Sequence, residues 1–456
     1  MKIKISRKLL FFIFWLALAL LAAFFHADHF LNGDEGVTLN GAWNLYNGRR
    51  LYVDFFSFLP PLSFFFLLFV WKIVGLGFWP AKIFSLLLLF SGAAGLYKIA
   101  GLLRKGLINL FVPLFFILVS SWWWIINHNV YQLIFSIWSV YFLSAYLKNN
   151  RRLYLVFSAL LSSAAIATLQ QKGLLLAFAS FLILLFFGSQ GFKQNWRSAL
   201  LYVAGVSLPL LSLLFFWPFA VLWNSLVVFP LFNYVEANRI SYYLLVLASA
   251  AWLSIVFVLR SRNRLRSALL ILSGFFIISC YPLPDYYHLS LALALLIPLL
   301  PDLFIFGGTV LNKAFRCLAL AGLSWLWLWP LSVFFIFLFF NFSFSRDYYF
   351  LDYVRKECPG KYLHVGPFLP NVYLETGKIS ATAFDILITG HQTPAQFAAA
   401  AAQLADNPPA CAVIANPESL SRFRHKTDNP VDNFIRANYR LVLNDGSVSV
   451  WRRQDD

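Results

Sequence analysis

The chain has 456 residues, of which 60% are hydrophobic, 19% aromatic and only 12% charged. A soluble domain carries roughly 25% charged residues, so this composition excludes an ordinary globular protein. Apolar runs such as 9–25, 83–103 and 318–340 are long enough to cross a bilayer, which takes about 20 residues. We therefore expect a multi-pass membrane protein whose N-terminal run stays in place as the first anchor.

The net charge of +17 would suggest nucleic-acid binding if it covered a soluble surface. Residues 1–342, however, hold 24 Lys/Arg and 7 Asp/Glu, whereas the remaining 114 residues hold 12 of each. The excess lies in the membrane portion, mostly in short loops, where basic residues set the orientation of the spans. We expect membrane lipids as partners and no nucleic acid.

The basic residues cluster at regular intervals along residues 1–342. The clusters are 2–8, 104–105, 148–152, 193–197, 260–266 and 313–316, and the connections between them hold few or no Lys/Arg. By the positive-inside rule, this alternation predicts a cytoplasmic N-terminus in the cell (inner) membrane, about eleven spans and an extracytoplasmic tail.

One apolar segment, 60–78, does not fit the alternation as a full span. It lies with 82–103 between an outer loop and a basic cytoplasmic cluster, so two crossings there would invert every later loop. It also opens with Pro60-Pro61 and contains Lys72, and a central lysine costs about 2.5–3.5 kcal/mol on insertion. We expect a re-entrant or interfacial helix within a first outer loop that covers 26–81.

The tail, 343–456, has the composition of a small α/β domain. Strands are expected at 361–365, 411–415, 439–443 and 448–451, and a helix at 394–404. Cys358 and Cys411 could pair if the tail is extracytoplasmic, although their spacing leaves this open.

The membrane portion contains seven carboxylates. They are Asp28, Asp34, Glu35, Asp54, Glu236, Asp285 and Asp302, and all but Asp302 fall on the predicted outer side. Asp34-Glu35 follow Gly33 directly after the first span. Adjacent acids at a low-dielectric boundary suit a general base or a cation site, which makes this pair the first candidate for chemistry.

The run DEGVTLNGAWNLYNGRRLYVDFFSFLPPL resembles the first extracytoplasmic loop of GT-C-fold glycosyltransferases. It is most similar to the group that contains protein O-mannosyltransferases and the lipid A aminoarabinose transferase. Weaker similarity extends to Gln171-Lys172-Gly173 and to 286–289. The resemblance implies a GT-C-like fold for the all-α membrane domain, residues 1–342, whereas the extracytoplasmic α/β domain at 343–456 matches no motif.

The same resemblance implies inverting transfer of a sugar from a dolichyl- or undecaprenyl-phosphate carrier to an extracytoplasmic lipid, glycan or protein. Asp34 matches the family's catalytic acid, which acts as base on the acceptor or positions it, and Glu35 is the acid paired with it. A divalent cation bound by Asp34 and Glu35 stays open, and no cofactor is otherwise expected.

Departure of the lipid phosphate develops negative charge that fixed cations can stabilise. The outer-side candidates are Arg49, Arg50, Lys72, Lys172, Arg239 and His288, with Tyr52, Asp54 and Tyr287 as further candidates. The family usually places another acid in the second outer loop, but residues 122–130 contain none. His128 or Asn129 could substitute there by hydrogen bonding.

Two other classes of function fit part of the pattern. One is another lipid-carrier enzyme, such as a glycan ligase, and the other is a lipid or sugar transporter. A transporter would need ionisable residues within its spans and usually a repeat, and neither is evident. The sequence therefore favours the glycosyltransferase.

Overall fold

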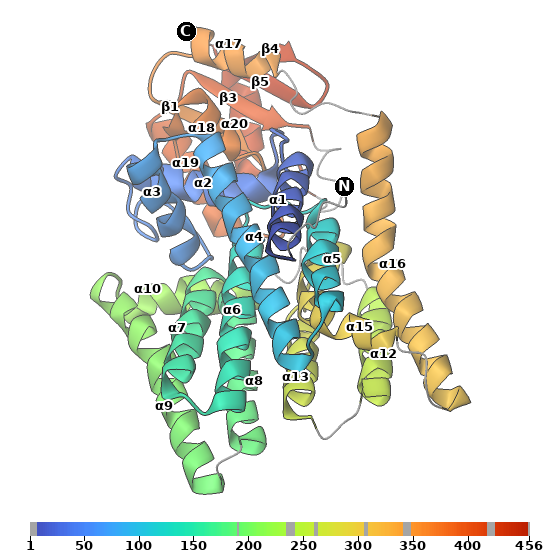
Figure 1. Cartoon of the computed structure of the whole chain (residues 1–456). Coiled ribbons are helices and arrows are strands. Elements are labelled where there is room, and N and C mark those ends of the chain that lie inside the picture. Colours follow the sequence, from blue (N-terminus) through green and yellow to red (C-terminus); the bar gives the residue numbers. More distant parts are fainter. Residues whose placement is uncertain are drawn as a thin grey trace.

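The computed structural model describes residues 7–188, 191–233, 242–259, 263–304, 309–340, 348–416 and 425–454. It comprises a helical bundle with a small mixed domain at one end (Figure 1). The predicted class, an all-α multi-pass membrane protein with a C-terminal α/β domain, is confirmed. Glu236 and Arg239 lie outside the described residues.

Eight helical segments of the described chain are long and apolar enough to span a bilayer. They are α1 (Arg7–Phe25), α4 (Phe78–Leu103), α6 (His128–Asn149), α8 (Gln170–Phe187), α9 (Phe192–Leu211, continued by η2, Ser212–Phe215), α12 (Tyr242–Leu259), α16 (Val310–Phe340) and a broken segment of α14 (Tyr286–Ala292), η4 (Leu293–Leu299) and α15 (Leu300–Leu303).

Three shorter helices pack among these eight segments. They are α5 (Phe111–Ser120), which follows η1 (Leu107–Leu110), α7 (Arg152–Thr168) and α13 (Arg264–Ile278). Gly173 on α8 shows how tight the packing is, because a Cβ there would lie 2.4 Å from the backbone nitrogen of Ile166 on α7. Such small residues let membrane helices approach closely. Eight segments of the described chain are thus long enough to span a bilayer, against the predicted number of about eleven.

The segment 60–78 forms the short helix α3 (Leu62–Val74), which does not cross the bundle. Its 13 residues extend only about 20 Å, against a hydrocarbon core of about 30 Å. Near its start, Phe64 packs with Leu51 and Trp217. Near its end, Trp71 belongs to the same buried cluster as residues of the C-terminal domain. Both ends of α3 therefore stay at the same end of the bundle, as the re-entrant interpretation expects.

The C-terminal domain contains a five-stranded sheet in the order β2-β1-β3-β5-β4, parallel at β2-β1-β3 and antiparallel at β3-β5-β4. Its elements are α17 (Tyr349–Glu357), β1 (Tyr362–Gly366), α18 (Asn371–Thr376), β2 (Ile379–Ser380), α19 (Pro394–Asp406), β3 (Cys411–Ala415), α20 (Pro430–Asn438), β4 (Tyr439–Asn444) and β5 (Val448–Arg453). The predicted strands and helix agree with these bounds to within two residues. A disulfide between Cys358 and Cys411 joins the end of α17 to β3.

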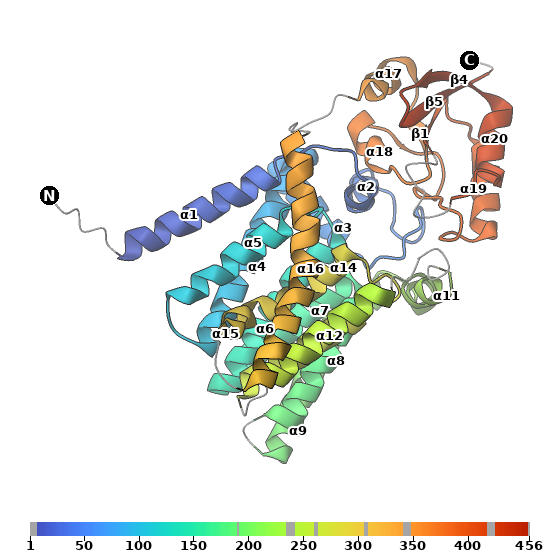
Figure 2. The ribbon, with the colours of Figure 1, turned by 90° about the vertical axis from the view of Figure 1, so that its right-hand side faces the viewer.

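The C-terminal domain lies at one end of the bundle. Figure 1 shows the domain at the top, and at the bottom the last turns of α8 and α12 and the first turns of α9 and α13, which carry basic residues such as Lys193 and Arg264. Figure 2 also shows that α1 extends outward, with its N-terminal end far from the domain. This segregation supports the predicted alternation of loops.

Candidate functional site

The acid pair lies on α2 (Gly33–Tyr46), which is packed between the bundle and the C-terminal domain. Asn32 caps the helix, and its side chain accepts hydrogen bonds from the backbone N–H groups of Asp34 and Glu35. Gly36 permits close approach of the domain, because a Cβ there would lie 2.8 Å from the backbone nitrogen of Asn371. The domain therefore helps to fix the position of the acid pair.

Glu35 is buried against a lysine that the sequence did not single out. Its side chain is 1% exposed, and Oε1 accepts hydrogen bonds from Lys82 Nζ at 3.3 Å and from the backbone N–H of Ile126 at 3.2 Å. Lys82 Nζ also lies 3.2 Å from Asp28 Oδ1. Burial raises the pKa of the Glu35 carboxyl, and the charge of Lys82 opposes that rise. Glu35 thus holds α2 against α4.

Asp34 occupies the half-exposed position next to Glu35. The charges of Asp34, Glu35 and Asp285 all act on the hydroxyl of Tyr287, which donates a hydrogen bond to Trp124 O at 3.3 Å. Asp285 caps α14 and lies 2.8 Å from Nδ1 of His288. The structure therefore brings Asp34, Tyr287 and His288 into one electrostatic neighbourhood at the end of the bundle that carries the C-terminal domain.

A cavity of about 860 Å³ lies beside this neighbourhood. Polar groups line one part of it, namely His128, Asn129, Gln170, Gln171, Lys172 and His288. The rest is mainly apolar, contributed by α8, α9 and the short helices α10 (Phe219–Trp223), η3 (Asn224–Val228) and α11 (Phe229–Phe232). The cavity thus combines an extended apolar wall with a small polar region.

Lys172 is the cation of that polar region. Its side chain is buried, and Nζ donates a hydrogen bond to Asn129 Oδ1 at 2.8 Å. Within the described chain it forms no ion pair, because Asp285 is paired with His288. A buried ammonium without an ion-pair partner favours an anionic ligand.

The hydrogen bonds around Asn129 also fix the role of His128. Asn129 Oδ1 accepts a hydrogen bond from Lys172, so the amide nitrogen Nδ2 of Asn129 faces Nε2 of His128 at 3.1 Å. Nε2 is then an acceptor, so the neutral ring carries its proton on Nδ1. That Nδ1 atom is buried and has no hydrogen-bond partner in the described part of the chain. His128 therefore lines the cavity and keeps an Nδ1–H that no described residue uses.

Arg49 contacts the C-terminal domain instead of the large cavity. It donates hydrogen bonds to Asn44 Oδ1, Asp54 O and Thr382 O at 2.9, 2.6 and 2.9 Å, and lies 3.7 Å from Asp385. Burial raises the pKa of the Asp385 carboxyl, and Arg49 opposes that rise. Arg49 ties the first loop to the domain and is not among the residues that line the large cavity.

The other first-loop candidates also lie outside that cavity. Arg50 and Asp54 form an exposed pair at 3.0 Å, and the ammonium of Lys72 lies 4.6 Å from the ring centroid of Tyr46. The Tyr52 hydroxyl donates to Leu59 O at 2.6 Å. These four residues are engaged with the loop and with α2, so the structure does not bring them to Lys172 and His288.

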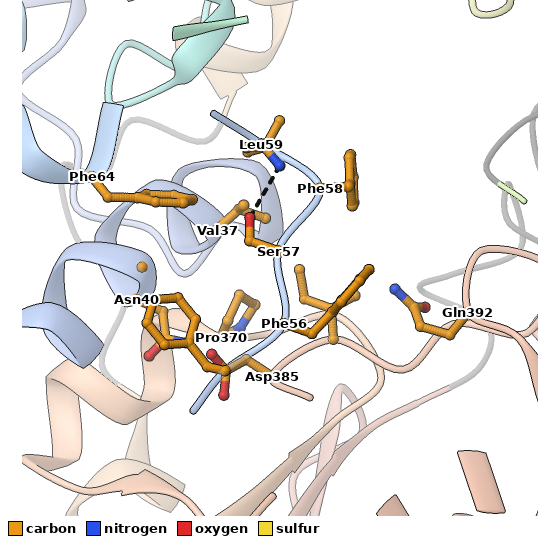
Figure 3. Close-up of a pocket in the computed structure, with 13 residues that line it drawn as sticks. Val37, Asn40, Phe56, Ser57, Phe58, Leu59, Phe64, Pro370, Asp385 and Gln392 are labelled. Atoms are coloured by element: carbon orange, nitrogen blue, oxygen red, sulfur yellow. Dashed lines mark hydrogen bonds between the residues drawn. The ribbon is translucent and has the colours of Figure 1, made fainter. Parts of the chain in front are cut away.

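A second, small cavity separates α2 from the C-terminal domain (Figure 3). In the close-up, Asn40 and Asp385 lie near each other, and Gln392 lies on the other side of Phe56. Its volume of about 40 Å³ suits water molecules and is too small for a sugar.

The divalent cation considered for the acid pair does not fit the observed contacts. Glu35 Oε1 is directed at the Lys82 ammonium, which already supplies positive charge. Within the described residues, no group of three or more His, Cys, Asp or Glu side chains is placed to hold a metal ion.

Comparison with known proteins reveals similarity of fold. One similar structure is AglB, an archaeal oligosaccharyltransferase from Archaeoglobus fulgidus in complex with an inhibitory peptide and a dolichol-phosphate. It aligns with a TM-score of 0.57 at 10% sequence identity, and the alignment covers 99% of this chain and 75% of AglB. The arabinofuranosyltransferase AftD from Mycobacteria aligns with a TM-score of 0.53 at 15% identity, over 98% of this chain and 40% of AftD. No family model and no curated protein matches the sequence. The chain therefore has the GT-C fold of membrane glycosyltransferases.

Proposed function

We propose that the protein transfers a sugar from a polyprenyl-phosphate carrier to an acceptor, with inversion at the anomeric carbon. The observation that carries this proposal is the large cavity, in which a buried, unpaired Lys172 meets an apolar wall. A lipid phosphate has the same two parts, because its tail needs apolar contact and its phosphate needs cations and N–H donors.

In this proposal the lipid lies along α9 to α11 and its phosphate faces Lys172, His128 and His288. As the bond between the anomeric carbon and the phosphate oxygen breaks, its electron pair leaves with the phosphate. Lys172 and the Nδ1–H of His128 stabilise that charge in a region with little water. The dolichol-phosphate in the AglB complex supports a lipid phosphate as ligand of this fold.

Asp34 is the proposed base. The acceptor hydroxyl or amine attacks the anomeric carbon from the face opposite the phosphate, and Asp34 takes its proton or positions it. Glu35 does not compete for this role because its Oε1 is engaged by Lys82 and Ile126. The acceptor approaches from the end of the bundle that carries the C-terminal domain, which we propose is extracytoplasmic.

A binding measurement tests the donor site. Purified protein in nanodiscs is titrated with radiolabelled polyprenyl phosphate, comparing the natural chain with Lys172→Gln. Loss of a charge-assisted contact predicts at least about tenfold weaker binding. Lys72→Gln is the matched control, since Lys72 is an exposed lysine of α3 outside the cavity. Equal binding by natural protein and Lys172→Gln would refute the assigned phosphate site.

A further inference from the structure

A second group of buried charges lies at the bundle end opposite the C-terminal domain. Asp302 of α15 is 7% exposed, with Oδ1 3.5 Å from Arg104 and Oδ2 3.1 Å from Arg266. Arg316 of α16 lies beside them and donates to Leu303 O at 3.4 Å. We call Arg104, Arg266, Arg316 and Asp302 the arginine cluster. It is remote from the proposed catalytic site and has no role in that chemistry.

The arginine cluster carries more positive charge than the described residues neutralise. Arg104 and Arg266 share the single carboxylate of Asp302, and Asp302 is the only Asp or Glu between residues 286 and 342. No Asp or Glu occurs between residues 55 and 235, which include Arg104 and its neighbours on α4 and α5. Partly buried cations are costly without a counter-charge, so this excess favours an anion from outside the chain.

The unused donors define the geometry of that anion. Nε and Nη2 of Arg104 are buried and have no hydrogen-bond partner among the described residues, and the same holds for Nε of Arg266. Nε and Nη2 form one edge of a guanidinium group. Two parallel N–H groups on such an edge match two oxygens of a phosphate. Arg104 therefore has one guanidinium edge that the described residues leave unused and that could pair with a phosphate once neighbouring side chains move aside.

Apolar side chains next to the arginine cluster identify the source of the phosphate. Leu107, Ile108 and Phe304 are 83%, 55% and 49% exposed. Phe304 directly follows α15, and its ring centroid lies 6.0 Å from that of Phe111, so these residues flank one region. Acyl chains would cover such a surface, whereas a free phosphate ion would leave it bare.

We propose that the arginine cluster binds the phosphate of an acidic phospholipid in the leaflet opposite the C-terminal domain. A zwitterionic phospholipid fits less well, because its ammonium group would face the excess positive charge. Bound in this way, the lipid joins the ends of α4, α13 and α16.

The test uses delipidated full-length protein in detergent. Its thermal midpoint is measured with added phosphatidylglycerol, phosphatidylcholine or inorganic phosphate, and native mass spectrometry records retained lipid. We expect phosphatidylglycerol alone to raise the midpoint. Arg266→Gln should bind it about tenfold more weakly, the effect of one charge-assisted hydrogen bond. Arg264→Gln, an exposed arginine on the same turn, should match the natural chain.

Three results would overturn the proposal. If both phospholipids raise the thermal midpoint equally, or if neither raises it, the cluster is not a site for acidic headgroups. This comparison uses the natural chain alone, so it does not depend on the folding of a variant. Full protection by inorganic phosphate would identify a free anion as the ligand. Unchanged binding by Arg266→Gln would place the lipid elsewhere.

Discussion

The ammonium of Lys82 lies 3.3 Å from Oε1 of Glu35, and this contact joins α4 to the first turn of α2. It separates the roles of two adjacent acids. Glu35 anchors the turn, and Asp34 is thereby held at a defined position beside the neighbourhood of Tyr287 and His288. Because the Lys82–Glu35 contact is buried, its loss should lower the free energy of unfolding of the protein.

Replacing Lys82 with Met should destabilise the protein by about 3 kcal/mol, the usual effect of leaving a buried charge without its partner. Thermal unfolding of the purified protein measures this. Arg50→Gln serves as control because it breaks an exposed pair with Asp54 and should leave the midpoint unchanged. Similar midpoints for Lys82→Met and the natural chain would show that the contact is not an anchor.

The disulfide should stabilise the C-terminal domain. Replacing Cys358 and Cys411 together by Ser should cost about 2–4 kcal/mol, largely because the unfolded chain gains freedom. Alkylation of the unreduced, denatured protein should modify Cys280 and Cys317 alone. Four modified cysteines would mean that the bridge does not form.

The C-terminal domain should lose stability in acid through His364. Burial lowers the pKa of this histidine to about 4 from a usual value near 6.5. Between these values the unfolded chain binds more protons than the folded one, so stability falls as pH decreases from about 6.5 towards 4. Unfolding midpoints at pH 7 and pH 4.5 should therefore differ less in His364→Gln than in the natural chain.

The two possible amide replacements of His128 should behave differently. The Asn side chain presents its N–H near the position of Nδ1, whereas the Gln side chain reaches the position of Nε2. If Nδ1–H supports the departing phosphate, His128→Gln should lose about 10²-fold in turnover and His128→Asn clearly less. If both variants lose turnover equally while binding the lipid normally, the Nδ1–H of His128 does not support the departing phosphate.

Much of the architecture could be predicted from the sequence because its signals are local. Apolar length and basic turns indicated the bundle, Lys72 and the proline pair indicated the short α3, and alternating residues located the strands of the tail. The resemblance of the first loop directed attention to Asp34, and Lys172 and His288, both named from the sequence, line one cavity.

The side-chain partners could not be predicted, because they depend on segments far apart in the chain. Arg49 was expected at a phosphate, but Asn44, Thr382 and Asp385 surround it in the folded protein. Lys82 resembled any lysine at the start of an apolar run. The tautomer of His128 follows only from the contact between Asn129 and Lys172.

In the proposed reaction, Asp34 acts on the acceptor during sugar transfer from a lipid phosphate. The most direct measurement is release of polyprenyl phosphate from labelled polyprenyl-phosphate hexose or pentose added to native membranes. At equal protein level, Asp34→Asn should lower the rate at least about 100-fold, whereas Asp54→Asn in the same loop should not. Undiminished release by Asp34→Asn would show that Asp34 does not act on the acceptor.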